Sequence, residues 1–346
     1  MTHQIALNFE DGVTRFVIAR EGETIADAAY RERINIPLDC RDGACGTCRC
    51  RVEAGDYEPG SYIEDALTAD EAAQGYALAC QAQPRSDLVV AIAASSDVCK
   101  TEAQTRPARL VAVKRLSPTT MAFTLEAGAP LSFLPGQYAS VTVPGTDQHR
   151  SYSFCSPPGQ PRLSFLVRDI PRGVMSSWLR ERAVPGTAMT LAGPAGSFYL
   201  RPLTRPVVML AGGTGLAPFL SMLARLGEAG AAYPIHLVYG VTNAADLVEL
   251  PALAAFAGRM PQFTFSTCVA DPASAHPRTG YVTDHLDPAA LNDGDVDIYL
   301  CGPPAMVEAV RGWLTARSTV PTNFYFEKFS PSGAVTVIGE AHHAGA

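Results

Sequence analysis

The chain has 346 residues, 47% of them hydrophobic and 18% charged, and a formal net charge of −7. A chain of this length is expected to fold as two or three domains of roughly 100 to 200 residues each, and this composition excludes wholesale disorder. Residues 1–100 carry 17 acidic and 9 basic side chains, whereas residues 101–346 carry 17 and 18, a balance that argues against nucleic acid as a partner.

The N-terminal segment and the cysteine count bear on where the protein works. The start, MTHQIALNFEDG, lacks the basic and apolar regions of a signal peptide, and no apolar stretch reaches the roughly 18 residues of a membrane span. We therefore expect a cytoplasmic location and no membrane partner. Because cytoplasmic thiols are kept reduced, the 9 cysteines do not predict a disulfide scaffold.

The first hundred residues begin with strand and helix signals. IALNF (5–9) and TRFVIA (14–19) predict two strands that are joined by the turn EDG. ETIADAAYRERI (23–34) follows, with Ile25, Ala28, Ala29 and Ile34 at helical spacing and Thr24 near the start. These two strands and this helix, together with the cysteine-rich loop that follows at residues 40–50, resemble the β-grasp ferredoxin fold.

The cysteine-rich loop CRDGACGTCRC (40–50) gives the sharpest spacing in the chain. Cys40, Cys45 and Cys48 form C-x4-C-x2-C, and Cys80 follows in LACQ. A zinc ribbon normally needs two C-x2-C pairs, and a thioredoxin-type redox pair leaves Cys40 and Cys80 unexplained. The plant-type spacing for a [2Fe–2S] cluster uses all four cysteines, so we predict that they ligate such a cluster.

Two glycines in this loop fit the same interpretation. Gly43 and Gly46 suit a loop wrapped around a metal centre, which needs positive φ and close backbone approach. Four of the five cysteines outside the spacing are interpreted as small bystander thiols: Cys50, Cys99, Cys155 and Cys268.

A polar stretch, ASSDVCKTEAQTRP (94–107), predicts a linker, and short strands punctuated by proline and glycine follow up to residue 202. This spacing predicts a small antiparallel barrel. In RSYS (150–153), Arg150 offers a donor for a phosphate, Tyr152 a flat face for a ring and Ser153 a hydroxyl for a ring edge. The alternative is an ordinary half-exposed strand.

A second stretch of the barrel region, VRDIPRGVMSSWL (167–179), predicts a phosphate seat. It places Arg168 at a strand end and Gly173 to Ser176 at the start of a helix. A helix N-terminus with spare N–H groups beside an arginine suits a pyrophosphate.

The last third predicts a parallel α/β sheet. RPVVMLAGGTGLAPFLSMLARL (205–226) reads as a strand, a glycine turn and an amphipathic helix, and further strands alternate with helical patterns. The turn has G-x-G-x-x-P from Gly213 to Pro218, so neither the Rossmann fingerprint nor the P-loop is present, while Gly215 allows a backbone to approach a phosphate. CGPPAM follows at the end of a strand, and Cys301 either faces a ligand crevice or is a buried thiol.

Five motifs stand in one order along the chain: CRDGACGTCRC…LACQ, RSYSF, AGGTGLAPFLSML, YLCGPPAMVEAV and FEKF. In that order they resemble the ferredoxin-type flavin reductases of ring-hydroxylating dioxygenases, and the chain looks most like the benzoate, toluate and anthranilate 1,2-dioxygenase reductase group. The resemblance covers Ile5 to Phe329. It implies a β-grasp [2Fe–2S] domain (1–98), a linker (99–106), an antiparallel FAD-binding barrel (107–203), a parallel α/β NAD-binding domain (204–330) and a flexible tail (331–346).

Carried over position by position, the resemblance implies three sets of site residues. The cluster ligands are Cys40, Cys45, Cys48 and Cys80. The flavin residues are Arg150, Ser151, Tyr152, Ser153, Val167, Arg168, Gly173, Met175 and Ser176. The nicotinamide dinucleotide residues are Gly212, Gly213, Thr214, Gly215, Asp271, Cys301, Gly302 and Pro303, and Phe329 resembles the aromatic residue that shields the flavin ring. Ser153, Cys301 and Phe329 are expected beside the reacting atoms.

Two features depart from the family pattern. Cys155 stands where relatives often have serine. SPSGAVTVIGEAHHAGA (330–346) extends past the usual end, and we interpret it as a frayed tail in which His342 and His343 bind no metal.

The function implied is electron transfer from NADH through FAD and the [2Fe–2S] cluster to a terminal Rieske oxygenase of the aromatic-acid 1,2-dioxygenase type. NADH delivers a hydride, whereas the cluster takes one electron at a time, so a flavin must stand between them and no general base is nominated. Ala270 ends the predicted strand FTFSTCVA and Asp271 follows it. A carboxylate there favours NADH because it repels a 2′-phosphate; Arg278 is the residue that could reverse this preference.

Two other functions stay open at this point. One is a reductase of a soluble di-iron monooxygenase, which has the same order of domains. Fast reduction of a Rieske oxygenase and slow reduction of a di-iron hydroxylase would exclude this alternative. The other is a redox-sensing interaction protein that seldom turns over. Sustained NADH consumption with an artificial acceptor would exclude this function.

Overall fold

The computed structural model describes residues 2–100 and 104–329. Residues 2–100 form one compact unit and residues 104–329 another, and each is described by itself. The predictions for the tail 331–346, including His342 and His343, lie outside the described residues. The proposed domain boundaries stay proposals.

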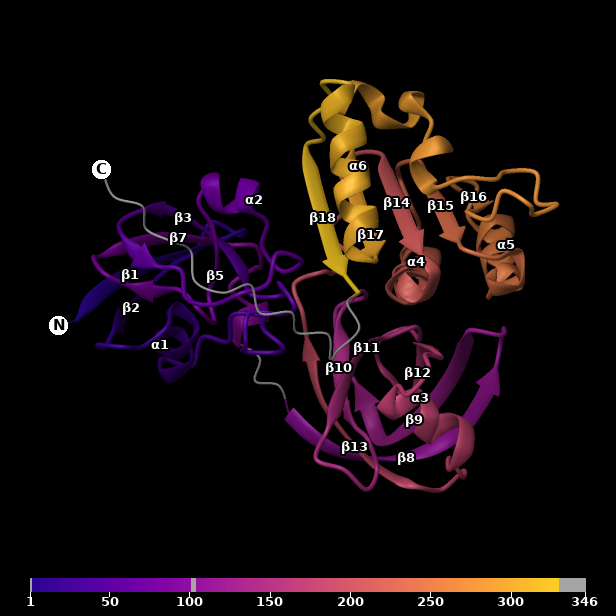
Figure 1. Cartoon of the computed structure of the whole chain (residues 1–346), viewed down its shortest axis with the longest axis horizontal. Helices are drawn as coiled ribbons and strands as arrows, with labels where there is room; N and C mark the ends of the chain where they lie inside the picture. The colour runs from indigo at the N-terminus through magenta and orange to yellow at the C-terminus, as the bar shows by residue number, and fades with distance from the viewer. Residues whose placement is uncertain (1, 101–103, 330–346) are drawn as a thin grey trace. The chain divides into compact units, whose positions relative to one another are not determined.

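The first unit is a mixed sheet with short helices (Figure 1). Its five-stranded sheet has the order β2-β1-β7-β3-β5, and β4 pairs with β6 separately. The strands are β1 (His3–Phe9), β2 (Thr14–Ala19), β3 (Arg49–Ala54), β4 (Tyr57–Glu58), β5 (Tyr76–Leu78), β6 (Gln83–Pro84) and β7 (Leu88–Ile92). The helices are α1 (Ile25–Arg31), α2 (Ala69–Ala73) and the 3-10 turn η1 (Val98–Lys100). β1 and β2 pair antiparallel, so the predicted hairpin is confirmed, whereas β1 and β7 pair parallel.

Helix α1 begins where the sequence predicts and ends earlier. The Thr24 hydroxyl accepts a hydrogen bond from the Asp27 amide at 3.1 Å, and the Asp27 side chain accepts from the Thr24 amide, which makes a capping box. The helix was expected to reach Ile34 but ends at Arg31. Arg33 has φ +60°, a left-handed conformation that ends the helix. The Ile34 amide donates to the Ala29 carbonyl at 2.9 Å, and the Ile34 side chain packs against the core from outside the helix.

The second unit begins with the predicted barrel. Its six-stranded antiparallel sheet has the order β11-β10-β13-β8-β9-β12, and a bridge between Phe154 and Phe165 joins its two edges. The strands are β8 (Gln104–Arg115), β9 (Thr120–Leu131), β10 (Tyr138–Thr142), β11 (His149–Ser153), β12 (Gln160–Arg168) and β13 (Ala188–Ala195), with one helix, α3 (Val174–Glu181). Gln104, Thr105 and Arg106 pair with β13, so these last residues of the expected linker extend a barrel strand.

A parallel sheet completes the second unit, as predicted. Its order is β16-β15-β14-β17-β18, and every neighbouring pair is parallel. The strands are β14 (Val207–Gly212), β15 (Ile235–Val241), β16 (Phe263–Val269), β17 (Asp297–Gly302) and β18 (Asn323–Lys328). The helices are α4 (Ala217–Ala229), α5 (Leu250–Arg259) and α6 (Pro304–Ala316), and the 3-10 segments are η2 (Gly213–Leu216), η3 (Ala244–Asp246), η4 (Val282–Asp284) and η5 (Pro288–Gly294).

Alternate strand residues of this sheet pack into two separate cores. Met209 and Tyr299 pack with residues of α4 and α5, whereas Leu210 and Leu300 pack with residues of α6. This two-sided burial explains the nearly continuous apolar runs of these strands. The carboxyl ends of the strands are left at one edge, where open α/β sheets bind ligands.

In the part of the chain that the structure describes, no helix has both the length and the apolar character needed to cross a membrane.

Candidate redox sites

The cysteine loop of the first unit folds around two glycines with left-handed backbone. Gly43 has φ +79° and Gly46 φ +72°. A Cβ on Gly43 would lie 2.3 Å from the carbonyl oxygen of Ser61, and one on Gly46 would lie 2.8 Å from that of Ala66. The positive φ and close backbone approach predicted for both glycines are confirmed, and a larger residue at either position would push the loop outward.

The four cysteines of the spacing lie as two thiol pairs, Cys40 with Cys45 and Cys48 with Cys80. Within each pair the hydrogen bond lowers the pKa of one thiol, Cys45 to about 6 and Cys80 to about 7, and raises the pKa of its partner, Cys40 or Cys48. Among residues 2–100 and 104–329, no three histidine, cysteine or acidic side chains gather as the ligands of one metal ion would. The charge of Cys45 also acts on Cys48 and Cys80, so the two pairs lie near one another, and a [2Fe–2S] cluster takes two thiolates on each iron.

Backbone N–H groups of the loop point at the sulfur atoms. The amides of Ala44 and Cys45 donate to Cys40 Sγ at 3.4 and 3.3 Å, and the amide of Thr47 donates to Cys45 Sγ at 3.5 Å. Such donors stabilise negative charge on sulfur, and they would favour the reduced state of a cluster held there. The loop therefore provides both the thiols and the donors that the proposed ligand role requires.

The other cysteines are held as neutral thiols. Burial raises the pKa of Cys50 and Cys99 to about 12 and that of Cys268 to about 11, and it also raises the pKa of Cys155. Cys50 Sγ donates to the carbonyl of Ala77 at 3.5 Å. Cys50, Cys99 and Cys268 are buried and Cys155 is half-buried; neutral thiols react slowly, which agrees with the interpretation of all four as bystanders.

In the second unit, strand β11 carries the predicted flavin residues. Ser153 is buried at the end of the strand, and the ring of Tyr152 meets Phe123 edge to face with 5.5 Å between ring centroids. Burial raises the pKa of the Tyr152 phenol, which therefore stays protonated. The Arg150 guanidinium donates to the His149 carbonyl and to Gln148 Oε1, so binding a phosphate would require it to exchange these local contacts.

The predicted phosphate seat lies where β12 leads into α3. Arg168 is exposed at the strand end. Gly173 is the N-cap residue of α3 and has no side chain that could accept from the first N–H groups of the helix, so these groups can serve a phosphate. Ser176 Oγ donates to the Ile170 carbonyl at 3.2 Å and fixes this turn. Val167 and Met175 are buried in the barrel core, from which they support the strand end and the helix.

The glycine turn after β14 packs directly on the end of β17. A Cβ on Gly215 would lie 2.2 Å from the carbonyl oxygen of Cys301, and one on Gly212 would lie 2.7 Å from Met306 Sδ. Gly213 has φ +56° and begins the 3-10 turn that Thr214 continues. The structure gives Gly215 a packing role at this crossing, and its contact with a phosphate stays a proposal.

A glutamate that the sequence interpretation did not nominate joins the barrel to the parallel sheet. Ser153 Oγ, at the end of β11, donates to Glu327 Oε2 at 3.2 Å, and Cys301 Sγ donates to the same oxygen at 4.0 Å. Cys301 and Glu327 are register partners on the parallel strands β17 and β18, which brings their side chains together. Burial and then the charge of Glu327 raise the pKa of Cys301, so the thiol keeps its proton.

The signal that could have revealed Glu327 lies in its strand. NFYFEK has aromatic residues in succession and then one acidic residue close to the carboxyl end of the last parallel strand. Ligand-binding side chains gather at this edge of an open sheet.

Two further nominated residues lie at the same edge. The Phe329 amide donates to the Gly302 carbonyl at 2.8 Å, and its half-buried ring packs against the core that contains Cys301. Pro303 is exposed and precedes α6. The structure thus brings Ser153, Cys301 and Phe329, predicted to lie beside the reacting atoms, to one region of the second unit.

Asp271 follows β16 at the carboxyl edge of the sheet. Its amide donates to the Thr242 carbonyl at 3.0 Å, and its side chain accepts from the Ala273 amide at 2.9 Å. Arg278 is exposed, and its carbonyl accepts from the Val269 amide at 3.0 Å. Both residues therefore flank the end of β16, where the choice between NADH and NADPH was predicted to be made.

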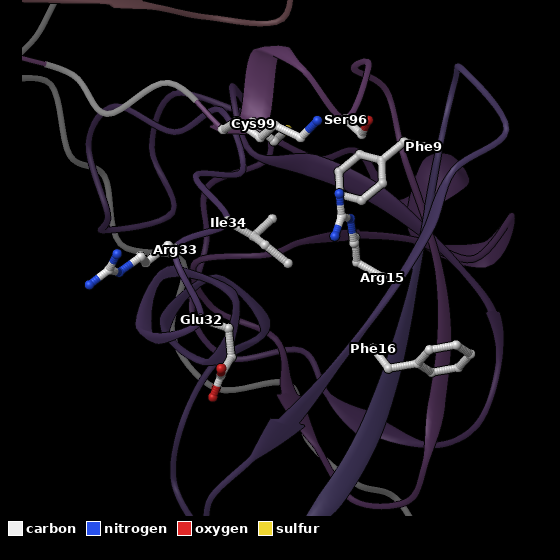
Figure 2. A pocket seen from close by; sticks show the side chains of 9 residues that line it. Phe9, Arg15, Phe16, Glu32, Arg33, Ile34, Ser96 and Cys99 are labelled. Carbon is white, nitrogen blue, oxygen red and sulfur yellow. The ribbon is translucent and has the colours of Figure 1, made fainter.

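Two pockets are lined by none of the residues that the sequence predicts for the sites. One of about 340 Å³ belongs to the first unit, and Figure 2 shows Arg15 and Ile34 beside it. The other, of about 310 Å³, lies between the barrel and helices α4 and α5, with Cys155 and Glu249 in its lining. Neither contains a cluster ligand or a nominated flavin or nicotinamide residue.

Comparison with protein families divides the chain into three matched segments. A 2Fe-2S iron-sulfur cluster binding domain matches residues 8–85, an oxidoreductase FAD-binding domain matches residues 107–199, and an oxidoreductase NAD-binding domain matches residues 209–312. The first match contains all four cysteines of the spacing, the second contains β11 and α3, and the third contains the glycine turn and β17.

Whole-chain relatives agree with this order. The toluate 1,2-dioxygenase electron transfer component of Pseudomonas putida is 54% identical over 96% of this chain and 100% of its own length. The anthranilate 1,2-dioxygenase electron transfer component of Acinetobacter baylyi is 41% identical over 96% of this chain and 98% of its own. Among solved structures, a cytochrome P450 reductase from Amycolatopsis is 33% identical with a TM-score of 0.70, covering 94% of this chain and 99% of its own.

Proposed function

Because this chain belongs to the electron transfer components of aromatic-ring 1,2-dioxygenases, we propose that it supplies a terminal Rieske oxygenase that acts on an aromatic acid of the benzoate type. The chain is an oxidoreductase whose cofactors are a [2Fe–2S] cluster, FAD and NADH. Electrons pass from NADH through FAD and the cluster to the oxygenase. A cytoplasmic location, where NADH is produced, is part of the proposal.

FAD supplies the step that joins a two-electron donor to a one-electron acceptor. The chain's own residues orient the partners and exclude water. Ser153 presents its hydroxyl at the end of β11, and Cys301 keeps its proton because it is buried beside Glu327. Phe329 covers the same region from the end of β18 and is proposed to shield the flavin ring.

The observation that carries this assignment is the meeting of Ser153, Cys301 and Glu327. It joins the barrel, which matches an FAD-binding domain, to the strands that match an NAD-binding domain. Hydride transfer needs the two reacting rings in near contact, so their binding sites must adjoin. Residues that come from both domains and share one hydrogen-bonded cluster meet that requirement.

The two thiol pairs are proposed to ligate the cluster from which electrons leave the chain. The loop donates N–H groups to Cys40 Sγ and Cys45 Sγ. Such donors favour thiolates, the form in which cysteine binds iron. The pyrophosphate of FAD is proposed to lie on Arg168, Gly173 and Ser176.

The partner is tested by supplying alternative acceptors. With NADH and the purified chain, a benzoate-type Rieske oxygenase is expected to be reduced at least about tenfold faster than a soluble di-iron hydroxylase, because complementary surfaces mainly set the rate of encounter. Stopped-flow absorbance of the Rieske centre measures the first rate, and spectroscopy of the di-iron centre measures the second. Faster reduction of the di-iron hydroxylase would replace the proposed partner with the alternative.

Asp271 is expected to determine the choice of nicotinamide cofactor. The wild-type chain should use NADH with a kcat/KM at least about tenfold above that for NADPH, because the carboxylate repels a 2′-phosphate. Asp271→Ser should raise the NADPH value about tenfold and change the NADH value less. Asp287→Ser alters an exposed aspartate of the same domain and is the control, expected to change neither. Equal NADH and NADPH efficiencies in the wild type would contradict this role.

A further inference from the structure

A buried aspartate ties the parallel sheet to the barrel away from the redox residues. Asp246 follows β15, and its Oδ1 accepts hydrogen bonds from Ser117 Oγ at 2.9 Å and from Thr119 Oγ1 at 2.6 Å. Ser117 and Thr119 lie in the turn between β8 and β9 of the barrel. The other carboxylate oxygen of Asp246, Oδ2, accepts a longer hydrogen bond of 3.4 Å from Asn243 Nδ2 in the same loop. One carboxylate oxygen therefore bridges the two domains of the second unit.

The bridge is buried and charged. Asp246 and Ser117 are 9% and 6% exposed. Burial alone would raise the pKa of the Asp246 carboxyl, but the hydrogen bonds from Thr119, Ser117 and Asn243 together hold it below its ordinary value. Charge-assisted hydrogen bonds of a carboxylate shielded from water are among the stronger polar contacts in proteins.

This bridge is one of several polar ties between the barrel and the sheet, among them the Arg201 amide, which follows β13 and donates to Tyr299 Oη of β17 at 3.0 Å. Ser153 donates to Glu327 on β18, and the buried Ser221 of α4 donates to the Ser156 carbonyl at 2.8 Å. β15, which precedes Asp246, stands three positions from β18 in the sheet, or about 14 Å at the usual strand spacing. A single contact would let the sheet pivot on the barrel, whereas contacts this far apart fix the tilt of the sheet relative to the barrel.

A pocket interrupts the packing near the bridge. The pocket of about 310 Å³ lies in this junction, with Ala122 and Leu166 of the barrel on one side and Leu220 and Ala252 on the other. Leu116, Ala122 and Leu166 of the barrel also pack with the core of α4 and α5, so the polar ties act together with this apolar contact.

We propose that Asp246 is a positioning residue for hydride transfer: its bridge to Ser117 and Thr119 fixes the tilt of the NAD-binding sheet, and so the alignment of the nicotinamide with the flavin. The inference rests on the proposed function, because it assumes that NADH reduces the flavin in this unit. Misplacing reacting groups by about 1 Å can lower a rate by about 100-fold, so a small tilt is sufficient.

The test is anaerobic stopped-flow reduction of the flavin by NADH over a range of NADH concentrations. Asp246→Ala is expected to lower the limiting rate at saturating NADH at least about tenfold while the Kd for NADH changes less than about twofold, since alignment and not binding is lost. Thr119→Val, which removes only the barrel hydroxyl, should lower the limiting rate about threefold or more. The band of the complex between reduced flavin and NAD⁺ should weaken in both variants.

Two further variants separate positioning from folding. Asp246→Asn keeps an acceptor oxygen for both hydroxyls and should restore the rate to within about threefold of wild type. Combining Ser117→Ala and Thr119→Val with Asp246→Ala should lower the limiting rate of flavin reduction no further than Asp246→Ala alone, because the three side chains form one contact. Asp287→Ala removes an exposed turn cap of the same domain, where Asp287 accepts from the Ala289 amide, and should leave the rate unchanged.

The outcomes are distinct. A limiting rate within about twofold of wild type in both Asp246→Ala and Thr119→Val would overturn the inference while leaving the proposed function intact. A raised Kd with an unchanged limiting rate would also overturn it, since Asp246 would then act on binding. If NADH fails to reduce the flavin of the wild-type chain, the proposed function fails and the inference fails with it. Should Asp246→Ala not fold, Thr119→Val alone decides the question.

Discussion

Replacing Cys80 by serine is expected to abolish NADH-driven reduction of cytochrome c, while NADH-driven reduction of a two-electron dye stays within about twofold of the wild-type rate. A hydroxyl is a poor iron ligand, so the thiol pair of Cys48 and Cys80 could no longer hold its iron. The dye takes electrons from the flavin directly, whereas cytochrome c takes them one at a time after the cluster. Steady-state assays with both acceptors, together with iron analysis, measure the effect.

Cys50→Ser is the matched control for this experiment. Cys50 is buried in the same unit but outside the spacing, and a serine hydroxyl can also donate to the Ala77 carbonyl. Both activities and the iron content should remain. If Cys80→Ser lowered dye reduction as strongly as cytochrome c reduction, the order of NADH, flavin and cluster would be wrong.

Replacing Gly215 by alanine is expected to lower the rate of flavin reduction by NADH at least about 100-fold, because the added methyl group displaces the proposed nicotinamide site by a distance comparable to 1 Å. A Cβ there would lie 2.2 Å from the Cys301 carbonyl oxygen and 2.7 Å from its carbon, so β17 or the turn after β14 must move. FAD content should be unchanged, since the barrel residues that are proposed to bind it lie elsewhere. Stopped-flow reduction by NADH and photoreduction of the same sample measure the two effects.

Gly312→Ala provides the comparison for that substitution. Gly312 lies in α6 of the same domain, and an added Cβ would meet nothing within 4 Å, so its flavin reduction rate should equal that of the wild type. Equal rates in Gly215→Ala would contradict the packing argument. Loss of photoreduction in Gly215→Ala would mean that the substitution damages the barrel and not the proposed nicotinamide site.

Much of the fold follows from short-range patterns in the sequence. The hairpin of β1 and β2, the barrel strands and the parallel strands each have a repeat of two or a continuous apolar run, and the structure contains all of them. The end of α1 could not be read in this way. Ile34 continues the helical spacing, but the left-handed residue Arg33 ends the helix before it, and residue spacing does not encode that conformation.

The candidate site divides in a similar way. The cysteine spacing and its glycines are local signals, and the structure places the four thiols together in pairs. Glu327 and Asp246 instead gain their roles from residues 174 and 127 positions away in the chain, Ser153 and Thr119. Only the register of β18 with β17 and the approach of the barrel to the sheet bring them together, and neither is written in a local pattern.

The most direct test of the account is an anaerobic titration of the purified chain with NADH, followed by visible absorbance and electron paramagnetic resonance. We predict that flavin absorbance bleaches and that the signal of a reduced [2Fe–2S] cluster rises with it, since both centres lie on one path from NADH. Bleaching of the flavin with no cluster signal, in a sample whose iron content matches a two-iron cluster, would contradict the account.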